Sequence, residues 1–310
     1  MTSTALSGNP VHAAPCSVRT TPKVSKDGLS ILLRTLGLVP DESKFTQDSL
    51  PTLVGIDFEN VINMKHGFSE SSDGQAGIAI LDPAKLDSCL PSELISTYNF
   101  IAGSPSYIAP ASARFIFGES TVVDPTEMLA SIEAVMPKHR PLVLVGHSPE
   151  QDVQVLASLG YELPPDTRVI DTRRIAGEVL GTISVSLGSL LRRLKCPFDG
   201  LHSAGNDATF ALRAALLLAA RVSESQYADE CSVLTAAATY PTSDRLIVLT
   251  KANKRAKKRE KEERERQKEL QKALKQMARA RTDEERDEIR AERAARRREA
   301  EMNADKFWSL

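Results

Sequence analysis

Hydrophobic and polar positions follow two periods across residues 50–222. Short, continuous apolar runs predict buried strands, at residues 53–58, 77–81, 141–145 and 169–170, and a further run predicts a strand at 114–118. Apolar residues at helical spacing predict helices at 125–135, 187–194 and 208–220. Three early strands followed by alternating helix and strand predict an α/β fold, with a mixed sheet flanked by helices.

The flanking segments have a different composition. Residues 1–25 mix Ser, Thr, Pro and Ala with few large apolar residues, so we interpret residues 1–49 as a mostly disordered segment, except that GLSILLRTLGL predicts a short helix against the body. The first residues are also poor in acids, which leaves a mitochondrial presequence as an alternative. Residues 223–250 are interpreted as a linker, followed by a charged helical tail at 251–310.

The tail contains neither Gly nor Pro, so nothing interrupts a long charged helix. Favourable i,i+4 pairs are expected at Glu260/Arg264, Glu262/Arg266 and Glu292/Arg296, and Thr282-Asp283-Glu284-Glu285 is a capping-box pattern where the helix could restart. Its apolar stripe covers barely two turns, whereas a coiled coil requires about 3–4 heptads; the stripe consists of Leu270, Leu274 and Met277.

Charge divides the chain in the same way. Residues 251–310 hold 21 lysines and arginines against 14 aspartates and glutamates, so this tail carries +7 and the first 250 residues carry −8. A solvated charged helix, a nucleic-acid-steering tail and a protein-binding helix all remain open. The basic cluster that would steer nucleic acid also resembles a nuclear-localisation signal; it consists of Lys254, Arg255, Lys257, Lys258 and Arg259.

Cysteine spacing and hydropathy indicate the cellular compartment of the protein. The four cysteines are scattered without a Cys-x-x-Cys pair, which argues against a zinc site or a disulfide framework and favours a reducing compartment. No apolar run reaches the roughly 18 residues of a membrane span. We therefore expect a cytoplasmic or nuclear protein with no membrane partner.

Three short blocks carry the candidate chemistry. In LVGIDFEN, Asp57 and Glu59 end an apolar strand two residues apart, so both carboxylates point to one face while Phe58 points to the core. Oxygen ligands on one face suit Mg²⁺ or Mn²⁺. By itself the pair could equally be an exposed strand end.

The second block, GHSPEQD, follows a buried strand and opens a helix, with Ser148 as the expected N-cap. It places Asp152 in the first helical turn, where an ordinary helix-terminal acid is the simpler explanation. His147 is interpreted as a structural residue that forms hydrogen bonds within this turn.

The third block, LHSAGNDA, is the most specific. Asp207 opens an apolar helix and His202 lies on the loop before it. A histidine near a helix start is usually structural, but this one stands at a fixed step from an acid.

The ordered series resembles the DEDDh 3′–5′ exonucleases of the ribonuclease-H-like superfamily. Their three blocks are Asp-x-Glu, a Gly-His-Asn-like stretch leading to Asp, and His-x4-Asp, and all five positions are filled here, by Asp57, Glu59, Asp152, His202 and Asp207. The resemblance covers roughly residues 50–222. The sister group with a catalytic Tyr four residues before the last Asp is disfavoured, because Ser203 occupies that position.

The third block is further similar to a fungal branch with a His-Asn-Ala-Gly-Asn-Asp-Ala-like string after a Leu-rich helix. Ser203 stands here in place of Asn, and Ser148 stands in the second block where Asn is commoner. Both departures affect positioning residues and leave the acids intact, so they bear on rate more than on the type of reaction.

The resemblance implies a ribonuclease-H-like sheet and hydrolysis with two divalent metal ions, Mg²⁺ or Mn²⁺. It implies that Asp57 bridges both ions, Glu59 and Asp207 complete the site of the ion that activates water, and Asp152 helps to hold the second ion. His202 would take the proton from that water. The expected substrate is single-stranded RNA or DNA with a free 3′ end, with RNA slightly favoured, and the product is a nucleoside 5′-monophosphate.

Two other functions stay open. One is a weakly active or inactive nucleic-acid-binding adaptor in RNA metabolism, and the other is a scaffold that acts through the charged C-terminal helix. Retention of all five positions favours the enzyme, because a decayed enzyme is expected to have lost at least one acid.

Overall fold

The computed structural model describes residues 21–39, 50–60, 73–138, 140–181, 185–240, 258–259, 261–269, 271–272, 286–288 and 290–299. The chain divides into two compact units, Met1–Val248 and Leu249–Leu310, which we describe separately. Several sequence predictions lie outside the described residues: the character of residues 1–20 and 40–49, the cluster at residues 254, 255 and 257, the apolar stripe of the tail, and the capping box at 282–285.

The first unit is built on a mixed sheet of six described strands in the order β4-β3-β2-β1-β5-β6. The strands are β1 (Thr52–Glu59), β2 (Gly74–Leu81), β3 (Ile95–Ala102), β4 (Thr121–Val122), β5 (Leu142–Gly146) and β6 (Arg168–Asp171). β1, β2 and β3 pair antiparallel, while β5 is parallel to both β1 and β6. This is the α/β, ribonuclease-H-like architecture that the sequence predicted.

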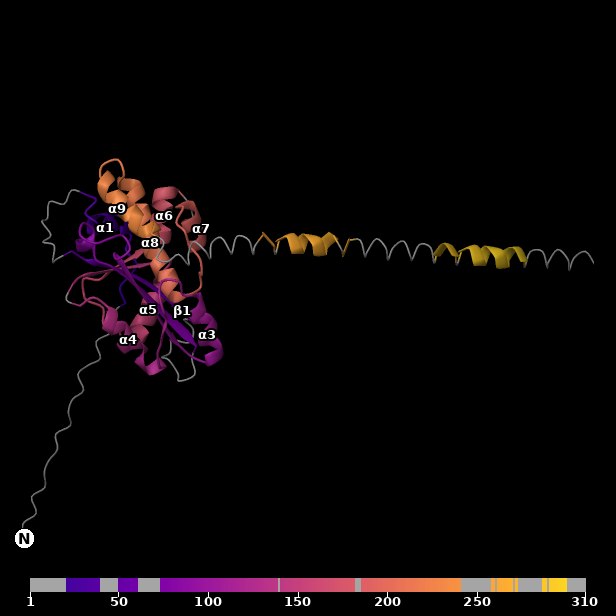
Figure 1. The fold of residues 1–310 in the computed structure, drawn as a ribbon, viewed down its shortest axis with the longest axis horizontal. Helices are drawn as coiled ribbons and strands as arrows, with labels where there is room; N and C mark the ends of the chain where they lie inside the picture. The colour runs from indigo at the N-terminus through magenta and orange to yellow at the C-terminus, as the bar shows by residue number, and fades with distance from the viewer. Residues whose placement is uncertain are drawn as a thin grey trace, which may run out of the picture. The chain divides into compact units, whose positions relative to one another are not determined.

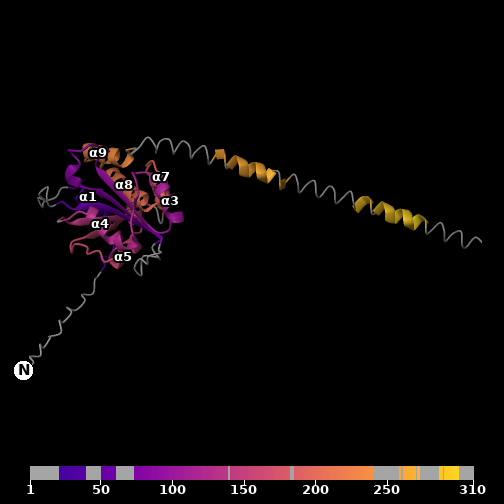
Figure 2. The same cartoon turned by 60° about the horizontal axis from the view of Figure 1, so that its bottom comes forward.

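Helices cover both faces of the sheet (Figures 1 and 2). On one face α8 (Ala204–Ser223) crosses β1, β2, β3 and β5, and it is packed in turn by α1 (Gly28–Thr35), α6 (Thr172–Leu180), α7 (Leu187–Arg193) and α9 (Ala228–Thr239). On the other face lie α4 (Met128–Val135) and α5 (Glu150–Ser158). α3 (Pro105–Arg114) contacts β3, and single 3-10 turns occur at Pro83–Lys85 and Pro125–Glu127.

The buried core explains why these strands could be recognised from sequence. The apolar runs that become β1, β2, β5 and β6 are largely buried, so they have no alternating polar face. Helices predicted at 125–135, 187–194 and within 28–48 are also present, the first of them as a 3-10 turn followed by α4.

The third early strand was predicted in the wrong place. Residues 115–118 form an irregular segment after α3, in which Phe115 and Ile116 are buried beneath other elements instead of pairing in the sheet. The strand is Ile95–Ala102, whose polar residues Thr97 and Asn99 hide the apolar pattern.

The linker prediction for 223–250 is wrong for residues 228–239, and residues 241–250 lie outside the described part of the chain. Residues Ala228–Thr239 form α9, which packs on α8 and buries Cys231 and Leu234. The sequence around α9 contains enough small apolar residues to form this face, including Ala237 and Ala238, which are also buried.

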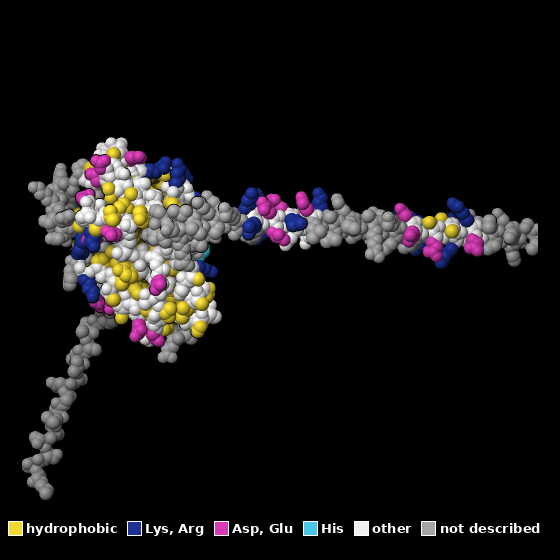
Figure 3. Space-filling view, viewed as in Figure 1, with side chains coloured by type: hydrophobic (Ala, Val, Ile, Leu, Met, Phe, Trp, Pro, Cys, Tyr) yellow, Lys and Arg dark blue, Asp and Glu magenta, His cyan; other side chains and the backbone are white. Residues whose placement is uncertain are grey.

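The described parts of the second unit are helical, and their side chains are exposed. The Glu292–Arg296 pair forms as expected, at 2.7 Å, and two pairs of the reverse order, Lys258–Glu262 and Lys261–Glu265, lie at 3.8 and 4.0 Å. Basic and acidic side chains are intermixed along these segments (Figure 3), and such exposed pairs contribute little to stability. Among all described helices, none combines the length and apolar character needed to cross a bilayer.

Candidate active site

The acidic end of β1 presents two carboxylates toward α8. Asp57 pairs with Gly77 of β2 and Glu59 pairs with Gln75, so these four residues share one face of the sheet. Phe58 points to the opposite face and joins the apolar core beneath α4 and α5. The strand therefore delivers both acids to one place, as the two-residue spacing predicted.

Glycines allow α8 to lie directly on this face. A Cβ atom on Gly77 would come within 2.0 Å of the Ala204 carbonyl, and one on Gly55 would lie 2.4 Å from the Ala208 oxygen. Larger residues at either position would hold the helix away from β1 and β2. The close approach brings Asp207, in the first turn of α8, over the end of β1.

Polar side chains from other elements fix where α8 begins. Asn99 of β3 accepts a hydrogen bond from the Gly205 amide at 2.9 Å, which satisfies one of the free N–H groups of the first turn. Asn206 accepts from the Ile116 amide and donates to the carbonyls of Arg114 and Gly200. The helix consequently starts at Ala204, four residues before the predicted start.

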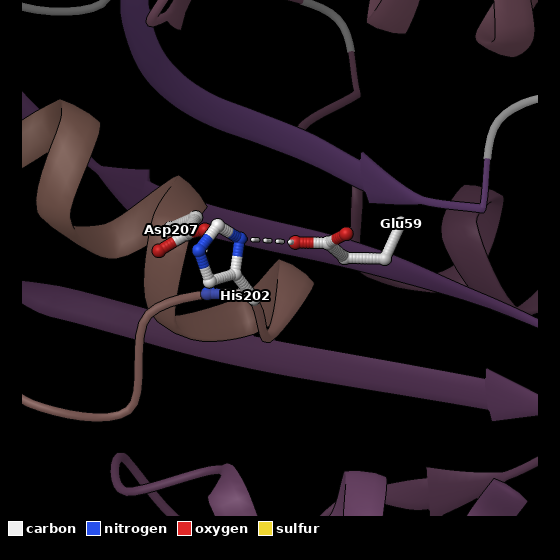
Figure 4. Close-up of side chains that lie close together, drawn as sticks. All are labelled: Glu59, His202 and Asp207. Carbon is white, nitrogen blue, oxygen red and sulfur yellow. Dashed lines mark hydrogen bonds and ion pairs between the residues drawn. The ribbon is translucent and has the colours of Figure 1, made fainter. Parts of the chain in front are cut away.

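His202 and Asp207 are held together by the backbone. The His202 amide donates to Asp207 Oδ2 at 3.0 Å, and His202 has a φ of 67°, a left-handed conformation that is uncommon outside glycine. This turn leaves the imidazole 84 % exposed, with Nδ1 4.0 Å from Glu59 Oε1 (Figure 4). One ligand atom each from Glu59, His202 and Asp207 lies within 4.8 Å of the others.

Asp152 reaches the same region from α5. Its Oδ1 accepts a hydrogen bond from the Phe58 amide at 3.0 Å, so the side chain crosslinks the helix to β1. The simple helix-terminal interpretation is therefore incomplete, because the carboxylate binds a group 94 residues away. The structure thus brings all five predicted positions to the end of β1.

The predicted capping by Ser148 is wrong. α5 begins at Glu150 with Pro149 before it, and no side chain caps it. Ser148 has a φ of 66°, and its amide donates to Asp171 Oδ1, at 2.9 Å. Asp171 of β6 thus accepts a hydrogen bond from the Ser148 amide. This bond to the sheet, and not a local cap, fixes the turn.

His147 has the structural role that its position suggested. Its Nδ1 lies 2.9 Å from Thr172 Oγ1 and its Nε2 lies 2.8 Å from the Val185 carbonyl, so it connects the end of β5 to the segments around α6 and α7. Burial lowers the pKa of His147, which keeps the ring neutral near pH 7. Its partners lie beyond the turn in which we expected its bonds.

Burial and mutual repulsion raise the proton affinity of the acids. The pKa of Asp57 is well above its usual range, first because of burial and then because of the charges of Asp152, Asp207 and Glu59. Burial raises the pKa of Asp152 to about 7, and that of Asp207 to about 7. Burial also raises the pKa of Glu59, although His202 and Arg114 oppose this rise.

Two oxygens in this cluster are unsatisfied. Asp57 Oδ2 and Asp207 Oδ1 are buried and have no hydrogen-bond partner among the described residues. An unpaired buried carboxylate oxygen is costly unless a proton or a cation compensates it. Buried carboxylate oxygens without partners are the donor set that hard divalent cations require, so the residues present fit such ions.

Some contributors were not apparent from the sequence. Asn99 lies on a strand that was predicted elsewhere, so its contact with α8 could not be anticipated. Gln75 and Tyr107 stand beside Glu59 but belong to no motif. Asn206 was visible within the third block, yet only the fold shows that it fixes the segment after α3.

A family model described as "DNA polymerase III subunit epsilon-like, C-terminal domain" matches residues 52–218, which is more than half of the chain. The chain belongs to the DEDDh exonuclease family. The match begins at the first residue of β1 and ends within α8, so this DEDDh domain includes every element that carries a site residue. DEDDh exonucleases use divalent metal ions, which agrees with the unsatisfied oxygens.

This DEDDh protein is similar in sequence to fungal proteins. An uncharacterized nucleolar protein of Schizosaccharomyces pombe is 28% identical over 116 residues, covering 35% of this chain and 47% of the relative. An uncharacterized protein of Saccharomyces cerevisiae is 26% identical over 174 residues, covering 44% of this chain and 36% of the relative. The chain thus spans less than half the length of these curated relatives.

Proposed function

We propose that this protein is a metal-dependent 3′–5′ exonuclease that hydrolyses single-stranded nucleic acid, with RNA favoured, to nucleoside 5′-monophosphates. The observation that carries the proposal is the convergence of four carboxylates and His202 at the end of β1, with buried oxygens of Asp57 and Asp207 left without partners. Family membership supplies the type of reaction.

We assign the carboxylates to two divalent ions, Mg²⁺ or Mn²⁺. Asp57 would be the shared ligand, because its Oδ2 is buried without a partner among the described residues and its charge interacts with those of Asp152, Asp207 and Glu59. Glu59 and Asp207 would complete one site, and Asp152 would contribute to the other. When bound, the cations supply charge neutralisation at the phosphate and acidify the attacking water.

The chain's own groups orient this chemistry. The Phe58 amide donates to one oxygen of Asp152, and the His202 amide donates to one oxygen of Asp207. These hydrogen bonds fix both carboxylates before the substrate arrives. His202 is the general base: its ring is exposed, lies 4.0 Å from Glu59 Oε1, and can accept a proton from water at the acid cluster. The backbone of His202 is left-handed, and its ring lies beside Asp207 with Nδ1 toward Glu59 Oε1 (Figure 4).

Location and partners follow from the same proposal. The nucleolar relative and the basic cluster near residue 254 favour a nuclear site of action. The charged C-terminal unit is proposed to contact nucleic acid or a protein partner, and the adaptor and scaffold functions are the outcomes to expect if catalysis is absent.

The deciding experiment uses the full chain with Mg²⁺ or Mn²⁺ and 5′-labelled single-stranded RNA and DNA, each with a free or a blocked 3′ end. We expect stepwise shortening that needs the metal and a free 3′ end. Asp207→Asn should reduce the rate by about 10³-fold or more, because it removes a charged ligand. Shortening that persists in Asp207→Asn would remove Asp207 from the centre, and binding without shortening in wild type would favour the adaptor.

A further inference from the structure

Two adjacent rows of residues cross the sheet on the face that carries Asp57 and Glu59. Glu59, Gln75 and Ile101 are neighbours across β1, β2 and β3, one pleat beyond Asp57, Gly77 and Asn99. α8 covers the row of Asp57, through Gly77 and Asn99. The next row is instead approached by α3, through Tyr107.

Gln75 is an unusual residue for this place. It is only 2 % exposed, and its Nε2 donates to Tyr107 Oη at 3.0 Å. Its Oε1 is buried and has no hydrogen-bond partner among the described residues. A buried amide oxygen without a partner is costly, so an additional donor is expected when the site is occupied.

Tyr107 supplies the complementary group. Its hydroxyl oxygen accepts from Gln75, and in the described part of the chain no acceptor is found for its proton. Its partner Gln75 lies directly opposite Glu59 on the neighbouring strand, so the half-buried phenol stands beside the acid cluster. A free donor on Tyr107 and a free acceptor on Gln75 therefore lie side by side.

α3 is fixed at both ends, so this pair has a defined position. At the first turn, the Ser104 amide and hydroxyl both donate to Asp73 Oδ1, at 2.7 and 3.1 Å. At the last residue, the Arg114 carbonyl accepts from Asn206 of α8 at 2.9 Å. The helix that carries Tyr107 is therefore tied to the helix that carries Asp207.

The chemistry of this pair matches a hydroxyl group, which donates one hydrogen bond and accepts another. In the proposed reaction the sugar of the last nucleotide is bonded directly to the scissile phosphate. This sugar must therefore lie next to the carboxylates that hold the phosphate. A ribose differs from a deoxyribose there by its 2′-hydroxyl, which is both donor and acceptor.

We propose that Gln75 and Tyr107 form a subsite for the 2′-hydroxyl of the 3′-terminal nucleotide, so that the substrate class is RNA. Gln75 Oε1 accepts from this hydroxyl, and Tyr107 Oη donates to its oxygen. This inference rests on the proposed exonuclease function. Without that function, the same pair still predicts that ribonucleotides bind better than deoxyribonucleotides.

The test uses the full chain with Mn²⁺ and two labelled DNA oligonucleotides that differ only in the last sugar, ribose or 2′-deoxyribose. The measured quantity is the ratio of the two rates of removal of that nucleotide. We expect wild type to remove the ribonucleotide about tenfold faster, as the loss of hydrogen bonds to one hydroxyl would predict. Tyr107→Phe and Gln75→Met should bring the ratio close to one.

Tyr161→Phe is the matched control. Tyr161 is also half-buried but packs against the core on the opposite face of the sheet, so this variant should keep the wild-type ratio. A purely structural contact between Gln75 and Tyr107 would lower both rates equally and leave the ratio unchanged, which would overturn the proposal. So would a wild-type ratio near one.

A second measurement separates this proposal from the exonuclease function. If wild type removes neither nucleotide, the proposed function fails, and binding of AMP and dAMP is compared by thermal shift in the presence of Ca²⁺. Greater stabilisation by AMP that is lost in Tyr107→Phe would support the 2′-hydroxyl subsite without catalysis. Equal stabilisation by the two nucleotides would overturn it.

Discussion

The two faces of β1 carry opposite kinds of residue, although they alternate along one strand. Val54, Ile56 and Phe58 join the apolar core beneath α4 and α5. Gly55 and Asp57 face α8, where the first allows close helix packing and the second carries a charge that burial disfavours. The even positions of β1 thus contribute to stability and the odd positions to the chemistry of the site. A substitution on this strand should affect mainly one of the two properties.

A large effect is expected for His202→Ala, which changes the residue that faces Glu59 at the polar face of β1. Removal of a general base typically costs about 10²–10⁴-fold in rate, whereas oligonucleotide binding in Ca²⁺ should stay close to wild type because the carboxylates remain. Single-turnover rates and equilibrium binding would separate the two effects. If binding fell as far as the rate, His202 would be a substrate contact and not the base.

A smaller loss of nuclease activity is expected for Gly77→Ala, which changes how closely α8 packs on the sheet. The new Cβ would lie 2.0 Å from the Ala204 carbonyl, so the helix must move. A displacement of about 1 Å near reacting groups costs about 10²-fold in activity. Overpacking lowers the free energy of unfolding by about 1–3 kcal/mol. Thermal denaturation and the nuclease assay measure both.

Two control variants are compared with Gly77→Ala. Gly28→Ala places its Cβ at an ordinary contact distance of 3.5 Å from Ile175 and should be tolerated. On the apolar face, Ile56→Val should cost about 0.5–1.5 kcal/mol of stability without loss of activity. Activity loss in Ile56→Val as large as in Gly77→Ala would show that the two faces are not independent.

The smallest effect concerns pH. Asp152 and Asp207 have pKa values of about 7 in the folded chain, above the value of about 3.9 expected for unfolded Asp. Because these pKa values are raised, their contribution to stability is complete below about pH 4 and is lost as the pH rises through about 7. The metal-free protein should therefore lose several degrees of Tm between pH 5 and pH 8.

The carboxylates are responsible only if replacing one changes this slope. Asp207→Asn should show a smaller fall in Tm over the same interval, and Mn²⁺ should stabilise wild type more at pH 8 than at pH 5, since protons compete with the cation. Parallel Tm curves for wild type and Asp207→Asn would assign the pH dependence to other groups.

The sequence predicted those parts of the site that depend on local spacing. Asp57 and Glu59 share a face because side chains alternate along any strand, and Asp207 lies in a first helical turn as expected. Contacts between distant segments could not be predicted in this way. Asn99 bonds α8 only because β3 passes beneath it. The Ser148 amide binds Asp171, 23 residues away, and no side chain caps α5.

The same limit explains the errors in the fold. The run at 115–118 is as apolar as a strand, but Asn206 takes the Ile116 amide that a neighbouring strand would need. The true third strand, β3, contains Thr97 and Asn99 because both contact α8, Thr97 through a hydroxyl pair with Thr209. Polar residues that serve a helix on the sheet therefore weakened the strand pattern.

The position of α8 in the chain has a consequence for biosynthesis. The residues that complete the acidic cluster, His202 and Asp207, are translated some 150 positions after Asp57 and dock only when α8 settles on Gly55 and Gly77. A nascent polypeptide that ends before this helix holds Asp57, Glu59 and Asp152 but cannot close the centre.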